Sequence, residues 1–139
     1  MSLNTKNIEQ ANQFLSEQEN GSFTVMDENG YPSTSAVWLI NQGDISEVYF
    51  STEVGSNKYK RLQKSSKASL NCHDNARNLT LVGDAEILTD QAIKTKQWRE
   101  PFIHIYPEGD TDPTYSIIRL KTKRVSMFLA EAPAEFELD

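Results

Sequence analysis

The pattern of apolar and polar residues changes its period several times along the chain. It begins at helical spacing, because Ile8, Ala11 and Leu15 form an apolar stripe that predicts an amphipathic helix over residues 4–19. The Asn20-Gly21 pair that follows is typical of a helix end, where glycine adopts a left-handed conformation without strain. We therefore expect the fold to open with a helix.

Beyond residue 21, short alternating or β-branched runs are separated by turn residues. Residues 33–40 alternate between two faces, and the Asn29-Gly30 pair before them is a strong hairpin signal. The predicted strands cover residues 22–27, 33–40, 47–52, 67–73, 79–88 and 117–129, and further helices are predicted from Ser56 to Lys64 and over 91–99. Strands and helices do not alternate regularly, so the pattern favours a mostly β antiparallel barrel over a doubly wound parallel sheet.

The remaining segments complete the domain. Gly83, in the middle of a long predicted strand, indicates a bulge or a close approach of another backbone. Residues 130–139 carry four acids and no base and are expected to form an acidic tail. With 139 residues and no linker, the sequence predicts one domain over residues 1–139.

Charge is distributed unevenly. The chain has 14 Lys and Arg against 20 Asp and Glu, a formal charge of −6, so a non-specific nucleic-acid partner is not expected. Residues 56–77 nevertheless have a local net charge of +5, with Asp74 as their single acid. The six basic residues of this island are Lys58, Lys60, Arg61, Lys64, Lys67 and Arg77. A solvated helix face and an anion-binding site are both compatible with it.

The sequence shows no sign of secretion or of metal binding. It has no apolar run long enough to cross a bilayer and no basic, apolar start, so we expect a cytoplasmic protein without a membrane partner. The single Cys72 cannot form an internal disulfide and is expected to be a small buried side chain. Residues His73 and His104 lack any zinc-ligand spacing, so no metal site is predicted.

The segment from residue 49 to residue 63 carries the strongest candidate chemistry. It joins a strand end, a short turn and a helix start, where unpaired backbone N–H groups favour an anion. Hydroxyl groups of Ser51, Thr52 and Ser56 and the charge of Lys58 would suit a phosphate group. The alternative is that Ser56 only caps the helix and Lys58 is solvated.

The order of motifs from Phe23 to Phe128 resembles a known family, the pyridoxamine phosphate oxidase-like FMN-binding split barrels, and within it the general stress protein branch. The motifs are the Asn29-Gly30-Tyr31-Pro32 hairpin before strand 33–40, Tyr49-Phe50-Ser51-Thr52, Ser56-x-Lys58, Gly83-x-Ala85, and Trp98 followed by the segment 106–115. Residues 106–115 are the piece most specific to that branch.

The resemblance implies a six-stranded antiparallel split β-barrel that forms a homodimer, with FMN in a cleft at the subunit interface. Carried over by position, Ser35, Ala36 and Val37 would line the flavin, Ser51 and Thr52 would bond to it, Ser56, Asn57 and Lys58 would hold its phosphate, and Asn78 would reach it from the facing subunit. No catalytic acid or base is implied.

Two departures from the vitamin B6 oxidases limit the activity. Those enzymes have basic residues near the positions of Ser35 and Asn57, which are uncharged here, and phosphate affinity is accordingly expected to be weaker. They also end in a basic, aromatic segment, whereas residues 130–139 are acidic and would repel a phosphorylated substrate. We do not expect oxidation of pyridoxamine phosphate.

Three functions remain at this point. The first is an FMN-dependent oxidoreductase with an unassigned small-molecule substrate, in which the flavin supplies the redox chemistry. The second is a flavin-binding or empty-barrel stress protein without turnover. The third is a split barrel that uses deazaflavin or haem, for which His73 or His104 would be the ligand to test.

Overall fold

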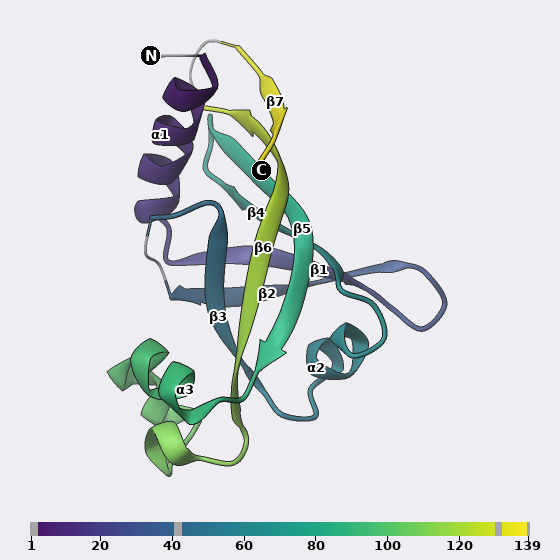
Figure 1. Cartoon of the computed structure of the whole chain (residues 1–139), viewed down its shortest axis with the longest axis vertical. Helices are drawn as coiled ribbons and strands as arrows, with labels where there is room; N and C mark the ends of the chain where they lie inside the picture. The colour runs from purple at the N-terminus through teal and green to yellow at the C-terminus, as the bar shows by residue number, and fades with distance from the viewer. Residues whose placement is uncertain (1–2, 41–42, 130–131, 139) are drawn as a thin grey trace.

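One antiparallel sheet rolls up on itself and closes into a barrel (Figure 1). The computed structural model describes residues 3–40, 43–129 and 132–138. Its strands lie in the order β3-β2-β1-β4-β5-β6-β7, and a further pairing of β3 with β6 closes six of them. This confirms the six-stranded antiparallel barrel predicted from the sequence.

The elements have the following bounds. The strands are β1 Asn20–Met26, β2 Pro32–Ile40, β3 Glu47–Glu53, β4 Lys67–His73, β5 Asn78–Leu88, β6 Tyr115–Phe128 and β7 Ala134–Glu137. The helices are α1 Leu3–Ser16, α2 Asn57–Leu62 and α3 Gln91–Gln97, with 3-10 turns η1 Glu100–His104 and η2 Gly109–Thr111. No helix in the described ranges is long and apolar enough to span a membrane.

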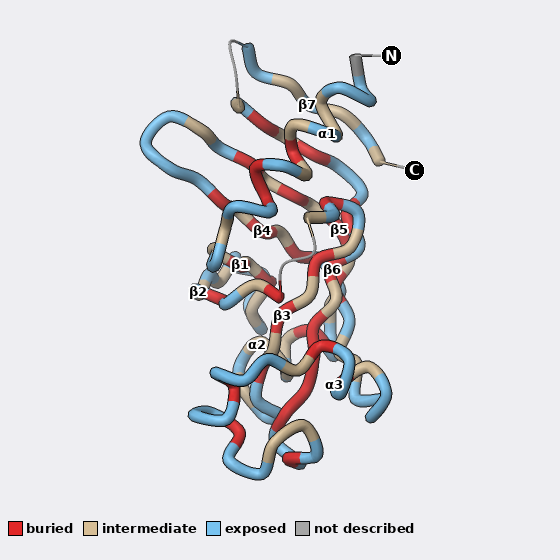
Figure 2. Tube along the Cα trace, turned by 90° about the vertical axis from the view of Figure 1, so that its left-hand side faces the viewer, coloured by how far each residue is buried: buried red, intermediate tan, exposed pale blue. Residues whose placement is uncertain are grey.

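Alternation along the strands builds the core. Inward residues of the barrel strands are buried (Figure 2), whereas the β1–β2 hairpin, which projects from the barrel in Figure 1, is exposed. Phe23 and Phe50 meet edge to face in this core, with ring centroids 4.6 Å apart. A second cluster, rich in aromatic residues, contains Phe102 of η1, Tyr106 and Tyr115.

The end of the first helix differs from the prediction. Helix α1 ends at Ser16 rather than near residue 19, and Asn20-Gly21 begins β1 instead of terminating the helix. A Cβ atom at Gly21 would lie 3.0 Å from Leu70 Cδ1 and 3.1 Å from Cys72 Sγ. The glycine is therefore explained by close packing against β4, which a local helix-end signal could not reveal.

The acidic tail contains a strand that was not predicted. Its residues 134–137 form β7, which pairs with β6 from Arg124 to Met127. Phe136 is half-buried against the core, while Glu135 and Glu137 face solvent. Part of the predicted acidic tail is therefore a paired strand, which was not among the strands predicted from the sequence.

Gly83 lies at a bulge, as its position in the sequence predicted. The register between β5 and β6 shifts between Val82 and Gly83. A Cβ atom at Gly83 would lie 2.0 Å from the backbone oxygen of Lys121, so no side chain fits there. Beside it, Asp84 forms an ion pair with Lys123 at 2.9 Å, and hydrogen bonding to Lys123 lowers the pKa of Asp84 to about 2.

We predict that Gly83→Ala lowers the free energy of unfolding by about 3 kcal/mol, because the β5–β6 backbones must separate to admit a methyl group. Gly30→Ala is the matched control: Gly30 has φ +83° but an open surrounding, so its loss should be about 1 kcal/mol. Urea unfolding of the three proteins measures both effects. An equal loss for the two variants would contradict the role given to Gly83.

Candidate functional site

The barrel opens where β2 and β3 stop pairing. Only Leu39 with Phe50 and Ile40 with Tyr49 pair between these strands in the described part of the chain. Beyond that point β3 stays paired with β6 as far as Glu53, and β2 stays paired with β1. The edges of β2 and β3 that face each other are therefore left without strand partners, so their backbone groups are available to a ligand.

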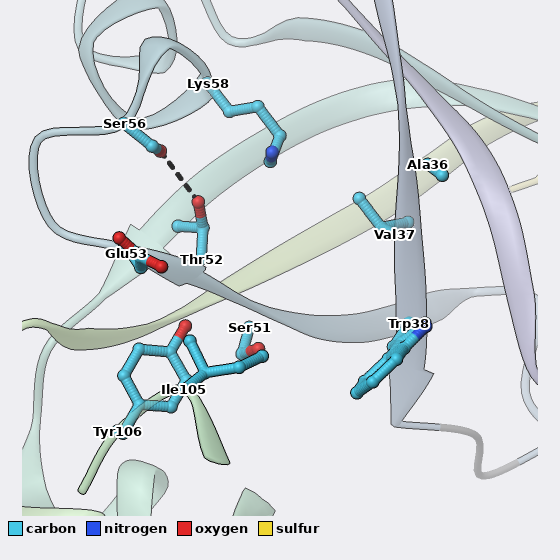
Figure 3. Close-up of a pocket in the computed structure, with 10 residues that line it drawn as sticks. All are labelled: Ala36, Val37, Trp38, Ser51, Thr52, Glu53, Ser56, Lys58, Ile105 and Tyr106. Atoms are coloured by element: carbon cyan, nitrogen blue, oxygen red, sulfur yellow. Dashed lines mark hydrogen bonds between the residues drawn. The ribbon is translucent and has the colours of Figure 1, made fainter. Parts of the chain in front are cut away.

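A cavity of about 400 Å³ occupies this opening (Figure 3). Its walls come from β2, β3, the start of α2 and the residues that follow η1. The lining residues are Ala36, Val37, Trp38, Ser51, Thr52, Glu53, Ser56, Lys58, Ile105 and Tyr106. A volume of this order is usual for a small-molecule or cofactor site.

Two hydroxyl groups form one wall. Thr52 Oγ1 and Ser56 Oγ lie 2.8 Å apart, and either can be the donor. Ser56 Oγ also caps α2 by accepting a hydrogen bond from the backbone N–H of Tyr59 at 3.2 Å. One of the two hydroxyl hydrogens is used in the bond between the groups. The second hydroxyl hydrogen is therefore left to donate to a ligand in the cavity.

Lys58 supplies the positive charge of the cavity. Its side chain extends from the start of α2 into the opening, toward Val37 (Figure 3). Within the described ranges it makes no ion pair, and the one lining carboxylate, Glu53, lies on the far side of Thr52. Helix α2 has six residues, shorter than predicted, so the charge at this site comes from side chains more than from a helix dipole.

The opposite wall is largely apolar. Trp38, whose side chain is 56% exposed, and Ile105 at 40% border the opening, and Tyr106 is buried beside them. Burial raises the pKa of the Tyr106 phenol, and a hydrogen bond with Ser51 partly opposes that shift. Tyr106 is therefore a neutral hydroxyl at physiological pH.

Two sets of contacts hold Tyr106 and the segment around it in place. Its ring packs 4.9 Å from that of Tyr115, and Trp98 and Phe102 complete the aromatic cluster. Asp112 accepts hydrogen bonds from the backbone N–H groups of Glu108 and Thr114 and from the Thr114 hydroxyl. The bonds from Thr114 lower the pKa of Asp112, which favours the ionised carboxylate that accepts these bonds.

The structure separates the predicted site residues into three groups. Six of them line the cavity together: Ala36, Val37, Ser51, Thr52, Ser56 and Lys58. Ser35 and Asn57 line an adjoining recess, which Lys58 also borders. Asn78 starts β5, where its Oδ1 accepts a hydrogen bond from Asn71 Nδ2 at 2.7 Å, and it does not line the cavity of its own chain.

Four lining residues are absent from the predicted site: Trp38, Glu53, Ile105 and Tyr106. Trp38 follows directly on the predicted site residues 35–37 in the same predicted strand, and its ring could stack on a planar ligand, although packing in the core or a dimer was the preferred interpretation. Ile105 and Tyr106 come from a distant segment without periodicity. No local signal indicated that this segment crosses back to β3.

The two histidines and the cysteine lie outside the cavity, and in the described part of the chain they form no second catalytic or metal centre. His104 lies on an open groove of η1, and His73 is exposed at the end of β4, so neither histidine lines the cavity. Burial raises the pKa of Cys72 to about 11, which keeps the thiol protonated. Among the residues that the structure describes, no cluster of His, Cys, Asp and Glu could hold a metal ion.

Comparison with known proteins identifies the family. A family model described as pyridoxamine 5′-phosphate oxidase matches residues 8–128, which include all the barrel strands from β1 to β6 and every residue of the cavity. The chain belongs to the pyridoxamine 5′-phosphate oxidase family. No curated protein matches the sequence.

Solved structures of similar fold fall in and around this family. A protein related to general stress protein 26, of the pyridoxinephosphate oxidase family, from Clostridium acetobutylicum is 25% identical, with a TM-score of 0.85 over 96% of this chain and 95% of that one. This likeness supports the general stress protein branch suggested by residues 106–115.

Two further structures, both below 25% identity, share the fold. A pyridoxamine 5′-phosphate oxidase-related, FMN binding protein from Nostoc punctiforme has a TM-score of 0.58 and 12% identity over 98% of this chain and 95% of that one. A heme binding protein from Mycobacterium smegmatis has a TM-score of 0.74 and 15% identity over 94% of this chain and 57% of that one. The fold by itself therefore leaves the ligand of this family member open.

Proposed function

We propose that the chain is an FMN-binding flavoprotein whose cofactor occupies the cavity between β2 and β3. The observation that carries this proposal is that Lys58, the Thr52–Ser56 hydroxyl pair and the edge of β2 converge on one cavity. FMN combines a dianionic phosphate, a polar chain and a planar ring. A cavity with a charged, hydroxyl-rich wall and an apolar wall matches that division.

Each wall suits a different part of the flavin. Lys58 and the free hydroxyl hydrogen of the Thr52–Ser56 pair would hold the phosphate end, since charge-assisted hydrogen bonds are the strong ones. Trp38 and Ile105 would cover the ring, and unpaired backbone groups of β2 would bond to its polar edge. Bound FMN would supply the redox chemistry, while the protein fixes its orientation and limits access.

Haem is the second candidate, because one solved structure of this fold is that of a heme binding protein. An axial ligand such as histidine commonly holds haem iron in proteins. Neither His73 nor His104 lines the cavity. The donor set of the cavity thus favours FMN over haem.

The reaction class follows from the cofactor rather than from an acid or base. Glu53 is the one carboxylate of the cavity and is exposed, and the Tyr106 hydroxyl is neutral and hydrogen-bonded. The proposed activity is accordingly that of a flavin-dependent oxidoreductase with an unassigned substrate. Steady oxidation of NAD(P)H by the FMN-loaded protein would distinguish such an enzyme from a flavin-binding protein without turnover.

An uncharged outer face of the barrel supports the expected homodimer. Strand register places two rows of outward-facing residues without a charge across β2, β1, β4 and β5. The rows are Ala36, Ser22, Asn71 and Thr80, and Thr34, Thr24, Ser69 and Val82. The centre of a protein interface typically has few charged residues. The absence of charge from these two rows is notable because 24% of the residues of the chain are charged.

This face adjoins the cavity. Ala36 belongs both to the uncharged face and to the cavity lining, and Asn78 reaches the same face through its bond to Asn71. A second copy docked there would cover the open side of the cavity. Such an arrangement would bring Asn78 to the facing site, in agreement with the expectation from the family.

We predict that Lys58→Ala weakens FMN binding by about 1–3 kcal/mol, the scale of a lost charge-assisted bond. Lys60→Ala removes an exposed cation of the same helix that does not line the cavity, so it should leave the affinity unchanged. Quenching of FMN fluorescence on titration measures both. Wild-type protein that fails to bind FMN would refute the proposed function, and equal affinities in all three proteins would remove Lys58 from the site.

A charge placed in the uncharged face should separate the proposed dimer. Ser69→Glu puts a carboxylate in the second row, where two copies would bury it, and we expect a shift from dimer to monomer. Thr89→Glu adds the same charge at an exposed position after β5 and should not change the oligomeric state. Sedimentation analysis reports the mass; a monomeric wild type, or a dimeric Ser69→Glu variant, would contradict this interface.

A further inference from the structure

One carboxylate of the main cavity has no role in holding the proposed flavin. Glu53 ends β3, where it pairs with Tyr115 of β6, and its carbonyl oxygen accepts a hydrogen bond from the backbone N–H of Ser56 at 3.0 Å. Its side chain is exposed and lines the cavity, and among the described residues it forms no ion pair. A backbone held in this way keeps an unpaired carboxylate at the opening.

Glu53 and Lys58 mark different parts of the cavity. Figure 3 shows Glu53 on the side of Thr52 that faces away from Lys58. Burial raises the pKa of the Tyr106 phenol, and the negative charge of Glu53 adds to that effect. The carboxylate is therefore close enough to Tyr106 to act on the part of the cavity that lies away from Lys58.

Binding of FMN would change the charge balance of the opening. Lys58 is the single lysine or arginine of the described cavity lining, and in the proposed function it is engaged by the flavin phosphate. A dianionic phosphate outweighs one ammonium group. A second molecule that enters beside the flavin would therefore meet Glu53 and find no free lysine or arginine among the described lining residues.

The groove of η1, whose residues directly precede Ile105 of the cavity, does not restore positive charge. Glu100 and His104 line this groove, and its described lining contains no lysine or arginine. Arg99 lines neither space, and its Nη1 donates a hydrogen bond to the carbonyl oxygen of Trp98 at 2.9 Å. The approach to the cavity along η1 therefore favours uncharged or cationic groups as well.

The described acids of the C-terminal tail lie at the other end of their own barrel. Glu135 and Glu137 belong to β7, which lies at the end where α1 packs, whereas α2 and α3 lie at the opposite end (Figure 1). The sequence attributed the repulsion of phosphorylated substrates to residues 130–139. Within one chain, the fold gives Glu53 the better position for that role.

We propose that Glu53 is a specificity-determining residue, which restricts the part of a substrate that enters beside the flavin to uncharged or cationic groups. The inference rests on the proposed function, because the phosphate of FMN is what engages Lys58. Trp38 and Ile105, which are 56% and 40% exposed at the opening, add apolar contacts. The substrate class is thus an apolar organic molecule whose reacting part carries no phosphate or carboxylate.

Quenching of Trp38 fluorescence tests the charge of the opening without a flavin. In a Trp98→Phe background Trp38 is the single tryptophan of the chain, and it lines the same cavity as Glu53. Iodide is an anionic quencher, caesium a cationic one and acrylamide a neutral one. At a constant ionic strength of about 0.1 M, Glu53→Gln should raise quenching by iodide and lower quenching by caesium, each about 1.5- to 2-fold, because charges act over about 10 Å there. Quenching by acrylamide should not change.

Two matched variants separate charge from structure. Glu53→Asp keeps the carboxylate and should preserve the wild-type order of the quenchers. Glu137→Gln removes an exposed acid of β7 and should leave all three quenching constants unchanged. Thermal unfolding verifies folding; if Trp98→Phe is unfolded, Trp38→Phe serves as the blank and subtraction isolates Trp38. Equal iodide quenching in the wild type and Glu53→Gln, or an acrylamide change as large as that for iodide, would overturn the proposal.

The FMN-loaded protein provides the second measurement. After anaerobic reduction, the flavin is reoxidised with ferricyanide, an anion, or with hexaammineruthenium(III), a cation; each accepts one electron, so two equivalents reoxidise one FMN. Glu53→Gln should raise the ratio of the ferricyanide rate to the hexaammineruthenium rate about 3- to 10-fold, and Glu137→Gln should not change it. An unchanged ratio would overturn the proposal and leave the proposed function standing. Failure of the wild type to bind FMN would refute the proposed function, and the quenching constants would still decide whether Glu53 rejects anions.

Discussion

The site depends on the short pairing between β2 and β3. Two residue pairs join these strands before they part, while β3 remains bound to β6 and β2 to β1 along their other edges. An antiparallel barrel that closed fully would bury the backbone groups of residues 35–38 in a ladder and fill its interior with side chains. The early separation instead leaves polar strand edges facing a cavity, into which α2 and the segment after η1 can each place side chains.

The fold also determines which basic residues of segment 56–77 reach the cavity. The basic island is divided by the structure: Lys67 pairs with Asp84 at 3.5 Å, and Arg77 pairs with Asp74 at 2.7 Å in the turn between β4 and β5. Lys60 and Lys64 border an outer recess near the hairpin, whereas Lys58 turns toward the main cavity. A cluster that is continuous in sequence is therefore dispersed by the fold, and Lys58 is its member that lines the main cavity.

The sequence predicted the strands well because each carries its own alternation and turn signals, as at Asn29-Gly30 and Gly83. It also predicted six residues of the cavity, since β2, the end of β3 and the Ser56 cap lie close together along the chain. It did not place Tyr106 in the cavity, because the position of Tyr106 depends on the aromatic cluster with Tyr115. Strand β7 was not predicted for a related reason: it forms because an edge of β6 is free, and no local pattern in residues 130–139 reveals that edge.

The central claim is that FMN occupies the opening between β2 and β3. Mapping the backbone amide shifts of ¹⁵N-labelled protein during an FMN titration tests it most directly, because it locates the ligand residue by residue. If FMN occupies this opening, the largest shifts fall on residues 35–38, 51–58 and 105–106, with little change on α1 and β7. Shifts centred on the groove of His104 or on α1, with the β2 and β3 edges unchanged, would contradict it.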